Sequence, residues 1–305
     1  MSEGVGLLFP GQGAQAIGMG RAAFACSAMA RDVFTRADRA LDYPLSRLCF
    51  EGPAEDLLQT RWQQPAILAC SIALLYAHVE REGAFAASCM TGHSLGLYSA
   101  LVVAEVMSLD AAIGLVARRG ELMQQAADEC PGGMAAILGL DDAVVEEICV
   151  AVSEPGDIVV VANYNAPGQV VISGALEALT RAMSTLKECG ARKIVPLAVA
   201  GAFHSPLMHA AAEALAPALR AATLAPPTAP VIANASARAL CDAAAIREEL
   251  LGQITAPVCW TAAMRYIIAN GTATLVDCGP SATLAGLLTR IAPDVAVIRL
   301  DGGGR

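Results

Sequence analysis

The segment Gly92-His93-Ser94-Leu95-Gly96 restricts the possible folds of this chain more than any other feature of its sequence. A short apolar run at 86–91 precedes it and a helical apolar pattern at 97–106 follows it, so the predicted order is buried strand, sharp turn and helix. Glycines are needed on both sides of the serine in such a turn, because side chains there would collide with the neighbouring elements. This G-x-S-x-G segment, 92–96, matches a nucleophile elbow and is called the elbow below; it predicts a nucleophilic Ser94 hydroxyl at a helix start. The alternative is an ordinary helix cap at Ser94.

The apolar pattern divides the chain into a central region and two flanking regions. In the centre it predicts, in chain order, strand 134–138, helix 141–152, strands 157–162 and 169–173, helix 175–188 and strand 192–199. This βαββαβ order is the ferredoxin-like arrangement. The flanking regions predict buried strands at 5–9, 86–91, 230–234 and 274–277, and a long helix that opens at Gln64.

We therefore predict an α/β fold built from two domains. Residues 1–128 and 200–305 would form an α/β-hydrolase-like large domain, and residues 129–199 would form an inserted ferredoxin-like small domain. The active site is expected in the cleft between them.

Composition narrows the setting in which such an enzyme would work. The longest apolar stretch, 66–77, is too short to span a bilayer, and no basic segment precedes an apolar one at the N-terminus. The ten cysteines are scattered singly, without spacing typical of a metal site. A net charge of −9 argues against nucleic acid or membrane as partner. We therefore expect a cytoplasmic protein without bound metal. Because the chain is acidic overall, an acidic protein partner could bind only at a local basic patch on its surface.

A serine nucleophile needs a base, and the chain has four histidines. The turn should point His93 away from Ser94, and His78 lies on an apolar helix and is expected to pack there. His209 follows one helical turn after His204 and is expected at the surface. His204, in a loop after a predicted strand, is the preferred base.

The third member of a triad is harder to find. The candidate acids begin or cap elements of the predicted insert, and none stands out: Asp128, Asp141, Asp142 and Asp157. A dyad, in which a backbone carbonyl orients the imidazole, fits as well or better.

Two adjacent arginines, Arg118 and Arg119, lie in a mainly apolar helical stretch after the elbow. Side chains at neighbouring helix positions point about 100° apart, so at most one of them faces Ser94. If both are solvated, neither has a role. If one lies in the cleft, its guanidinium could pair with a substrate carboxylate.

Four segments in this order resemble the malonyl-CoA:acyl-carrier-protein transacylases. They are Phe9-Pro10-Gly11-Gln12-Gly13-Ala14-Gln15, Gly92-His93-Ser94-Leu95-Gly96, Arg119-Gly120 and Gly201-Ala202-Phe203-His204-Ser205-Pro206. The resemblance covers nearly the whole chain, and its motifs match in both order and spacing. It implies malonyl-CoA as substrate, no bound cofactor, and two partners, a coenzyme A thioester and an acyl carrier protein.

The resemblance also implies a role for each catalytic group. Ser94 would attack the thioester carbonyl and His204 would take its proton. The backbone N–H groups of Gln12 and Leu95 would form the oxyanion hole, and the Gln253 carbonyl would orient His204. Arg119 would hold the malonyl carboxylate, and Arg118 would remain at the surface.

Further residues are assigned to binding. Gln64 and the 165–169 loop, with Gln169, would line the cleft. Phe203 would narrow the pocket beside the malonyl α-carbon and disfavour methylmalonyl groups. Arg192 and Lys193 would dock the carrier protein, unless they are only a solvated pair of charges.

Leu97 departs from the family pattern, since a glutamate follows the elbow in many members that serve fatty-acid synthesis. The pathway is therefore open between fatty-acid synthesis, polyketide assembly and malonate decarboxylase systems. Two other functions also fit: a serine thioesterase or esterase that hydrolyses an acyl-CoA, and a non-catalytic docking subunit with the same fold.

Overall fold

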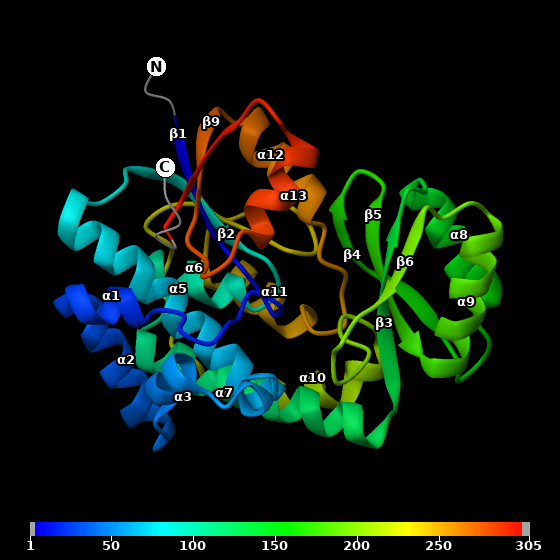
Figure 1. Ribbon diagram of the computed structural model, residues 1–305, viewed down its shortest axis with the longest axis horizontal. Coiled ribbons are helices and arrows are strands. Elements are labelled where there is room, and N and C mark those ends of the chain that lie inside the picture. The colour runs from blue at the N-terminus through cyan, green and yellow to red at the C-terminus, as the bar shows by residue number, and fades with distance from the viewer. Residues whose placement is uncertain (1–3, 301–305) are drawn as a thin grey trace.

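Strands from both ends of the chain form one six-stranded sheet in the computed structural model, which describes residues 4–300 (Figure 1). The strand order is β10-β9-β1-β2-β7-β8. All neighbours are parallel except β7 and β8, which are antiparallel. The bounds are Gly4–Phe9 (β1), Ala87–Gly92 (β2), Val231–Ile232 (β7), Ala239–Leu240 (β8), Thr272–Asp277 (β9) and Ala296–Arg299 (β10).

Helices cover both faces of this sheet, and the alternation of side chains in β1 shows how. Leu7 and Phe9 point into one core and Leu8 into another, because successive residues of a strand face opposite sides. The Leu8 face packs against α12 (Trp260–Ala269) and α13 (Thr283–Ile291).

The other face carries the larger helical layer. Its helices are α1 (Arg21–Cys26), α2 (Ala28–Leu41), α3 (Leu45–Glu51), α4 (Ala54–Leu57), α5 (Thr60–Glu82), α6 (Gly96–Val103), α7 (Leu109–Glu129), α10 (His209–Ala221) and α11 (Ala243–Gly252). A short 3-10 turn, Pro206–Met208, precedes α10. Helix α5 is buried over most of its circumference, as expected for a helix that is apolar all round. It begins at Thr60, before the predicted start at Gln64, so Gln64 lies within its first turns.

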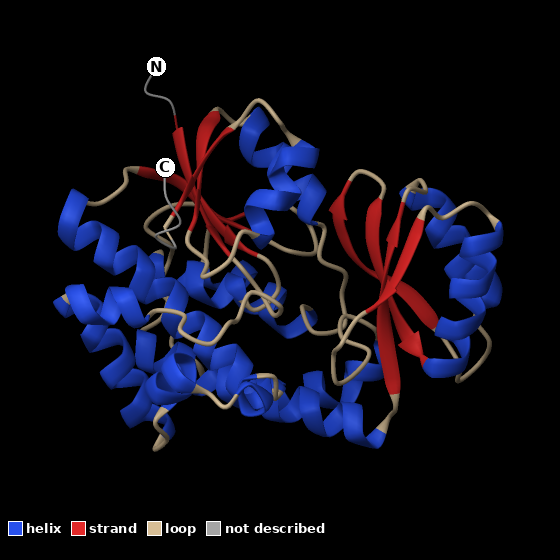
Figure 2. Ribbon diagram, in the orientation of Figure 1, coloured by secondary structure: helices blue, strands red, loops and turns tan. Residues whose placement is uncertain are grey.

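The central region forms a separate antiparallel sheet with the order β4-β5-β3-β6. In chain order its elements are β3 (Gly132–Leu138), α8 (Asp142–Val152), β4 (Val159–Ala166), β5 (Gln169–Ala175), α9 (Leu176–Glu188) and β6 (Lys193–Pro196). Ala135 and Ile137 pack against α8 and α9, whereas Met134 on the opposite face joins the core of the larger part. Figure 2 shows the helices on the outer side and the strands turned toward the rest of the molecule.

Most of the predicted strands differ from the structure by a few residues at their ends, and the structure gives a reason for two of them. Strand β6 ends at Pro196 instead of continuing to Val199, because the chain turns away after the Leu197 N–H bonds to the Met134 carbonyl. Strand β4 begins at Val159 instead of Asp157, because the backbone N–H and carbonyl of Asp157 bond to Glu154 in a tight turn. No helix within 4–300 combines the length and the apolar character needed to cross a membrane.

Candidate active site

The turn between β2 and α6 holds Ser94 in a conformation that only a tightly packed site maintains. The φ angle of Ser94 is +51°, in the left-handed region that residues with side chains rarely adopt. A Cβ on Gly92 would lie 1.9 Å from the carbonyl carbon of Gly96, and one on Gly96 would lie 2.0 Å from the Phe9 carbonyl oxygen. Both glycines are therefore required for β2, α6 and β1 to approach one another here, as the elbow pattern predicts.

Ser94 and His204 form a hydrogen-bonded pair in the interior. The Ser94 Oγ lies 2.7 Å from His204 Nε2, and the two side chains come from positions 110 residues apart. The other ring nitrogen, Nδ1, lies 3.0 Å from the carbonyl oxygens of both Gln253 and Ala256. Because carbonyls only accept, Nδ1 carries the proton and Nε2 presents its lone pair to the serine.

The electrostatics of this pair favour a neutral imidazole. Burial, and secondarily the positive charge of Arg119, lowers the pKa of His204 to about 3. No carboxylate within 4–300 bonds to the ring: Asp128 accepts from Gln124, and Asp157 pairs with Arg181. The site is a dyad, with two backbone carbonyls in the place of an acid.

Arg119 lies beside the dyad and is completely buried. Its Nη1 donates to Gln64 Oε1 at 2.7 Å, and its Nη2 donates to Ser94 Oγ at 3.2 Å and to Gln253 Oε1 at 3.4 Å. Its Nε has no partner within the described chain, and no carboxylate there forms an ion pair with it. Burial lowers the pKa of the guanidinium, which shows how costly its desolvation is.

A close helix contact places Arg119 where it is. A Cβ on Gly120 would lie 2.6 Å from the Thr60 carbonyl oxygen, so the glycine lets α7 approach the first turn of α5. Gln64 on α5 then meets Arg119 on α7. Arg118 points outward and pairs with Glu121 at the surface.

Gln253 connects Ser94, His204 and Arg119. Its carbonyl accepts from His204, its Oε1 accepts from Arg119, and its Nε2 donates to the Ser94 carbonyl at 2.9 Å. The same Nε2 donates to Asn234 Oδ1, and Asn234 donates to the Gly92 carbonyl at 2.7 Å. The elbow and the segment that orients His204 are thus fixed to each other.

Two backbone N–H groups near Ser94 have no acceptor within the described chain. They belong to Leu95, at the start of α6, and to Gln12, in the loop after β1. Unpaired N–H groups next to a nucleophile are suited to stabilise an oxyanion.

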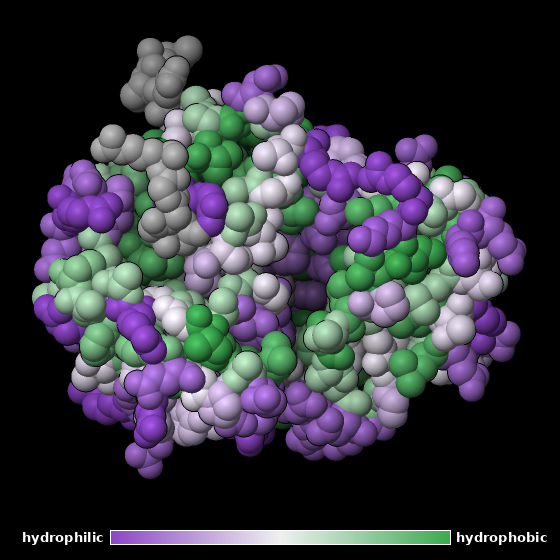
Figure 3. All heavy atoms as spheres, viewed as in Figure 1, coloured by the Kyte–Doolittle hydropathy of each residue, from purple (hydrophilic) through white to green (hydrophobic). Residues whose placement is uncertain are grey.

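A pocket opens above the dyad between the two parts of the molecule. It is lined by Gln12, His93, Ser94, Met134, Asn163, Leu197, Val199, Phe203 and His204. Figure 3 shows the surface hollowed between the large part and the insert, with hydrophilic residues in the depth of the hollow. A ligand that reaches Ser94 would contact both parts.

Comparison with known proteins supplies the family. Residues 7–297 match the acyl transferase domain family. A malonyl CoA-acyl carrier protein transacylase of Salmonella typhimurium is 42% identical over 294 residues, which are 96% of this chain and 94% of the relative. The chain belongs to the malonyl-CoA:acyl-carrier-protein transacylase family. A transacylase of Bacillus subtilis with the same name is 41% identical and covers 94% of this chain and 90% of its own length.

Solved structures of transacylases share the fold. The malonyl CoA-acyl carrier protein transacylase of Coxiella burnetii superimposes with a TM-score of 0.94 at 36% identity, over 98% of this chain and 94% of that one. A malonyl-transacylase solved in complex with a holo type II PKS acyl-carrier protein has a TM-score of 0.93 at 40% identity, over 97% of this chain and 95% of that one. The α/β architecture is therefore that of the transacylase structures.

Five of the six predicted binding residues do not line the pocket, and Phe203 does. Arg119 meets it through its hydrogen bond to Ser94, and Gln64 meets it through Gln12. Gln169 does not line the pocket, and its Oε1 accepts from Arg290 of α13 at 2.6 Å. Arg192 and Lys193 are exposed at the start of β6.

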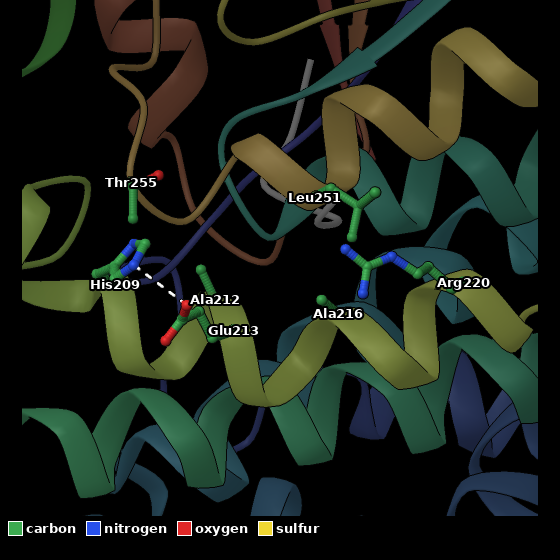
Figure 4. Close-up of a pocket in the computed structure, with 7 residues that line it drawn as sticks. All are labelled: His209, Ala212, Glu213, Ala216, Arg220, Leu251 and Thr255. Atoms are coloured by element: carbon green, nitrogen blue, oxygen red, sulfur yellow. Dashed lines mark ion pairs between the residues drawn. The ribbon is translucent and has the colours of Figure 1, made fainter.

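His78 and His209 lie outside the pocket, as predicted from their positions in the sequence. His78 stacks on Phe85 with ring centroids 4.5 Å apart. His209 pairs with Glu213 at the edge of a separate hollow between α10 and the end of α11, together with Arg220 and Leu251 (Figure 4). Ser94 and His204 do not line that hollow.

Several contributors to the transacylase site were not predicted from the sequence. They are the Ala256 carbonyl, Asn234 and Gln63, and also the hydrogen bond of 2.8 Å between His93 Nε2 and the Oδ1 of Asn165, which itself belongs to the predicted 165–169 loop. A carbonyl oxygen has no residue signature, and isolated amides have no spacing that would single them out. The neighbouring Gln64 could have drawn attention to Gln63.

Proposed function

We propose that this chain transfers a malonyl group from coenzyme A to the phosphopantetheine thiol of an acyl carrier protein through an acyl-Ser94 intermediate. The observation that carries the proposal is the buried Arg119, which lies 3.2 Å from the nucleophile and has no carboxylate partner within 4–300. A buried charge without a counter-charge is costly, and a substrate carboxylate would supply it. The names of the relatives, and the relative solved with its carrier protein, also support malonyl transfer.

The first half-reaction follows from the geometry of the dyad. The Ser94 oxygen attacks the thioester carbonyl while His204 Nε2 takes its proton. The N–H groups of Gln12 and Leu95 stabilise the oxyanion, and the carbonyls of Gln253 and Ala256 hold the imidazolium that forms. The intermediate then collapses, the C–S bond breaks, and His204 returns the proton to the coenzyme A thiolate.

The second half-reaction reverses these steps with another thiol. His204 takes the proton of the phosphopantetheine thiol, whose sulfur attacks the acyl-Ser94 ester. When the C–O bond breaks, the proton returns to Ser94. In both half-reactions Arg119 would hold the malonyl carboxylate with its free Nε–H and with Nη2. The Nη2 group would then no longer donate to Ser94 Oγ, as it does in the structure. No step needs a bound cofactor or a metal.

We extend the proposal to the organisation of the molecule. The large part, 1–128 and 200–305, is proposed as an α/β-hydrolase-like catalytic domain, and 129–199 as a ferredoxin-like insert, supported by its strand order β4-β5-β3-β6. Phe203 in the pocket would limit the acyl group, while Arg192 and Lys193 would dock the carrier.

Ten unpaired cysteines support a reducing compartment, for which we propose the cytoplasm. Fatty-acid and polyketide assembly both use such a transfer.

The test is to incubate the protein with malonyl-CoA alone and to determine the intact mass and the modified peptide. A malonyl adduct on the peptide with Ser94, absent from the Ser94→Ala variant, would support the nucleophile and the substrate. Addition of a holo carrier protein then separates transfer from hydrolysis. Malonyl carrier is the expected product, and free malonate alone would replace the transferase by the thioesterase.

A further inference from the structure

A buried glutamine on α5 contacts the loop that carries a proposed oxyanion donor. Gln63 is 6% exposed, and its Oε1 accepts a hydrogen bond from the side-chain Nε2 of Gln12. The Gln12 Oε1 faces the Gln64 amide nitrogen at 3.5 Å, and the Gln64 Oε1 accepts from Arg119 at 2.7 Å. Gln12 and Gln64 thus connect the loop after β1 to the guanidinium beside Ser94, and Gln63 holds the Gln12 side chain through its amide nitrogen.

The loop has few other contacts that could fix Gln12. Near it, the Ala14 N–H reaches the Gly11 carbonyl only at 3.4 Å, and the Gly13 N–H bonds to Gln15 within the same loop. Gly11 lies against the elbow, since a Cβ there would be 2.5 Å from the His93 carbonyl oxygen. The backbone of Gly11 therefore rests against the elbow, and the next residue, Gln12, is connected to the helical layer by its side chain.

We propose that Gln63 is a positioning residue for acyl transfer. By accepting from the Gln12 side chain it holds the Gln12 backbone N–H where the thioester oxyanion forms. The inference rests on the proposed function, because it assigns Gln63 to the oxyanion step of that reaction. An oxyanion forms when Ser94 is acylated and again when the acyl group leaves, so Gln63 acts in both half-reactions.

Gln63 is distinct from the residues that hold the substrate. It does not line the pocket around Ser94, and it makes no hydrogen bond to Arg119. Substrate affinity should therefore be independent of it, whereas the rate should depend on it. A substitution of Gln64 could not separate affinity from rate in this way, because Gln64 bonds directly to Arg119.

The experiment compares three variants in the full chain. Gln63→Leu removes the acceptor, and Gln63→Glu keeps an acceptor oxygen at the same reach. Gln59→Leu is the matched control, since Gln59 precedes the same helix and bonds to Asp56, away from Gln12. For each we would measure kcat/KM of malonyl transfer, and the Kd of malonyl-CoA in the Ser94→Ala background.

We expect Gln63→Leu to lower kcat/KM by about 10- to 100-fold. The Gln12 N–H would be displaced and not deleted, so only part of its stabilisation of the oxyanion would be lost. Its Kd should stay within about twofold of the parent, as for a group that acts mainly in the transition state. Gln63→Glu should recover most of the rate, and Gln59→Leu should retain it. An unchanged rate in folded Gln63→Leu would overturn the proposal, as would a rise in Kd that accounts for the whole loss.

A second variant decides the question if Gln63→Leu fails to fold. Gln12→Met removes this hydrogen bond from the loop side, together with the contact from Gln64, and keeps the backbone N–H. It should lose at least as much rate as Gln63→Leu, and the double variant should lose no more than Gln12→Met alone. Full activity of Gln12→Met would overturn the inference. A wild-type protein that forms no malonyl adduct at Ser94 would instead overturn the proposed function.

Discussion

The two sides of the active-site pocket are built from different kinds of side chain. The large part supplies the hydrogen-bonded Ser94 and His204, with Arg119 and Gln253 buried behind them, and its other lining residues are Gln12, His93 and Phe203. The insert supplies mainly the apolar Met134, Leu197 and Val199, together with Asn163. The difference supports the proposal that the large part carries out the chemistry, while the insert shapes the space available to the acyl group.

Removal of the guanidinium from the polar side of the pocket is expected to have the largest effect on the reaction. Arg119→Ala should lower kcat/KM for malonyl-CoA by about 10²- to 10³-fold, because a buried ion pair that loses one partner costs about 3–5 kcal/mol. The surface neighbour provides the control: Arg118→Ala breaks only the exposed pair with Glu121 and should change the rate less than about twofold. Unchanged malonyl loading in Arg119→Ala would mean that the carboxylate binds elsewhere.

The pH dependence tests the environment of the dyad. A histidine with an ordinary pKa of 6.5 would lose about 30-fold of its neutral form at pH 5. Since the pKa of His204 is lowered to about 3, the rate of Ser94 acylation should show no inflection near 6.5. Stopped-flow or quenched acylation between pH 5 and 8 measures this. A loss that follows the ordinary titration would place His204 in a more polar environment.

The same shift predicts a stability effect. The folded pKa lies below that of the unfolded chain, so the unfolded state binds the proton first. The contribution of His204 to the free energy of unfolding should therefore decline as pH falls below about 6.5. Denaturant unfolding of wild type and His204→Gln between pH 7 and 5 isolates this contribution. An equal decline in both proteins would contradict the assignment.

The shape of the pocket is expected to affect selectivity more than rate. Phe203→Ala should raise kcat/KM for methylmalonyl-CoA by about 10-fold and change that for malonyl-CoA less than about threefold, because it enlarges the space without removing a polar contact. Competition between the two thioesters, read out by the mass of the acylated protein, measures the ratio. If methylmalonyl is already accepted equally by the wild type, Phe203 does not limit the acyl group.

The smallest effect is expected at the exposed basic pair. Replacement of Arg192 and Lys193 by alanine should raise KM for the carrier protein by about threefold at low salt, since exposed charges contribute little each. Acylation by malonyl-CoA should be unchanged, because neither residue lines the pocket. The carrier dependence at two salt concentrations would check this. An unchanged KM would leave the two residues as a solvated pair.

Local patterns in the sequence predict the parts of this structure that depend on local sterics. The glycines around Ser94 and the alternation of apolar residues indicate the elbow, and the strands and helices of 129–199 follow in the predicted order. Elimination among four histidines suggests His204, which the structure places 2.7 Å from Ser94.

Contacts that depend on tertiary packing were beyond the local pattern. The Ala256 carbonyl carries no side-chain signal, and the contact between Gln63 and Gln12 joins residues 51 positions apart. Residues 197–199 read as strand because they are apolar, but they leave the sheet and line the pocket. Apolar character predicts burial, and it does not distinguish a core from a pocket wall.

The two carbonyls that orient His204 also determine the charge of the site before substrate binds. A carbonyl has a dipole but no net charge, so within 4–300 the guanidinium of Arg119 is not neutralised by the group that holds the imidazole. An aspartate in that place would already compensate Arg119. The site of the free protein is therefore a cation, and an acyl group with its own negative charge makes it electrically neutral, whereas an uncharged acyl group leaves it positive.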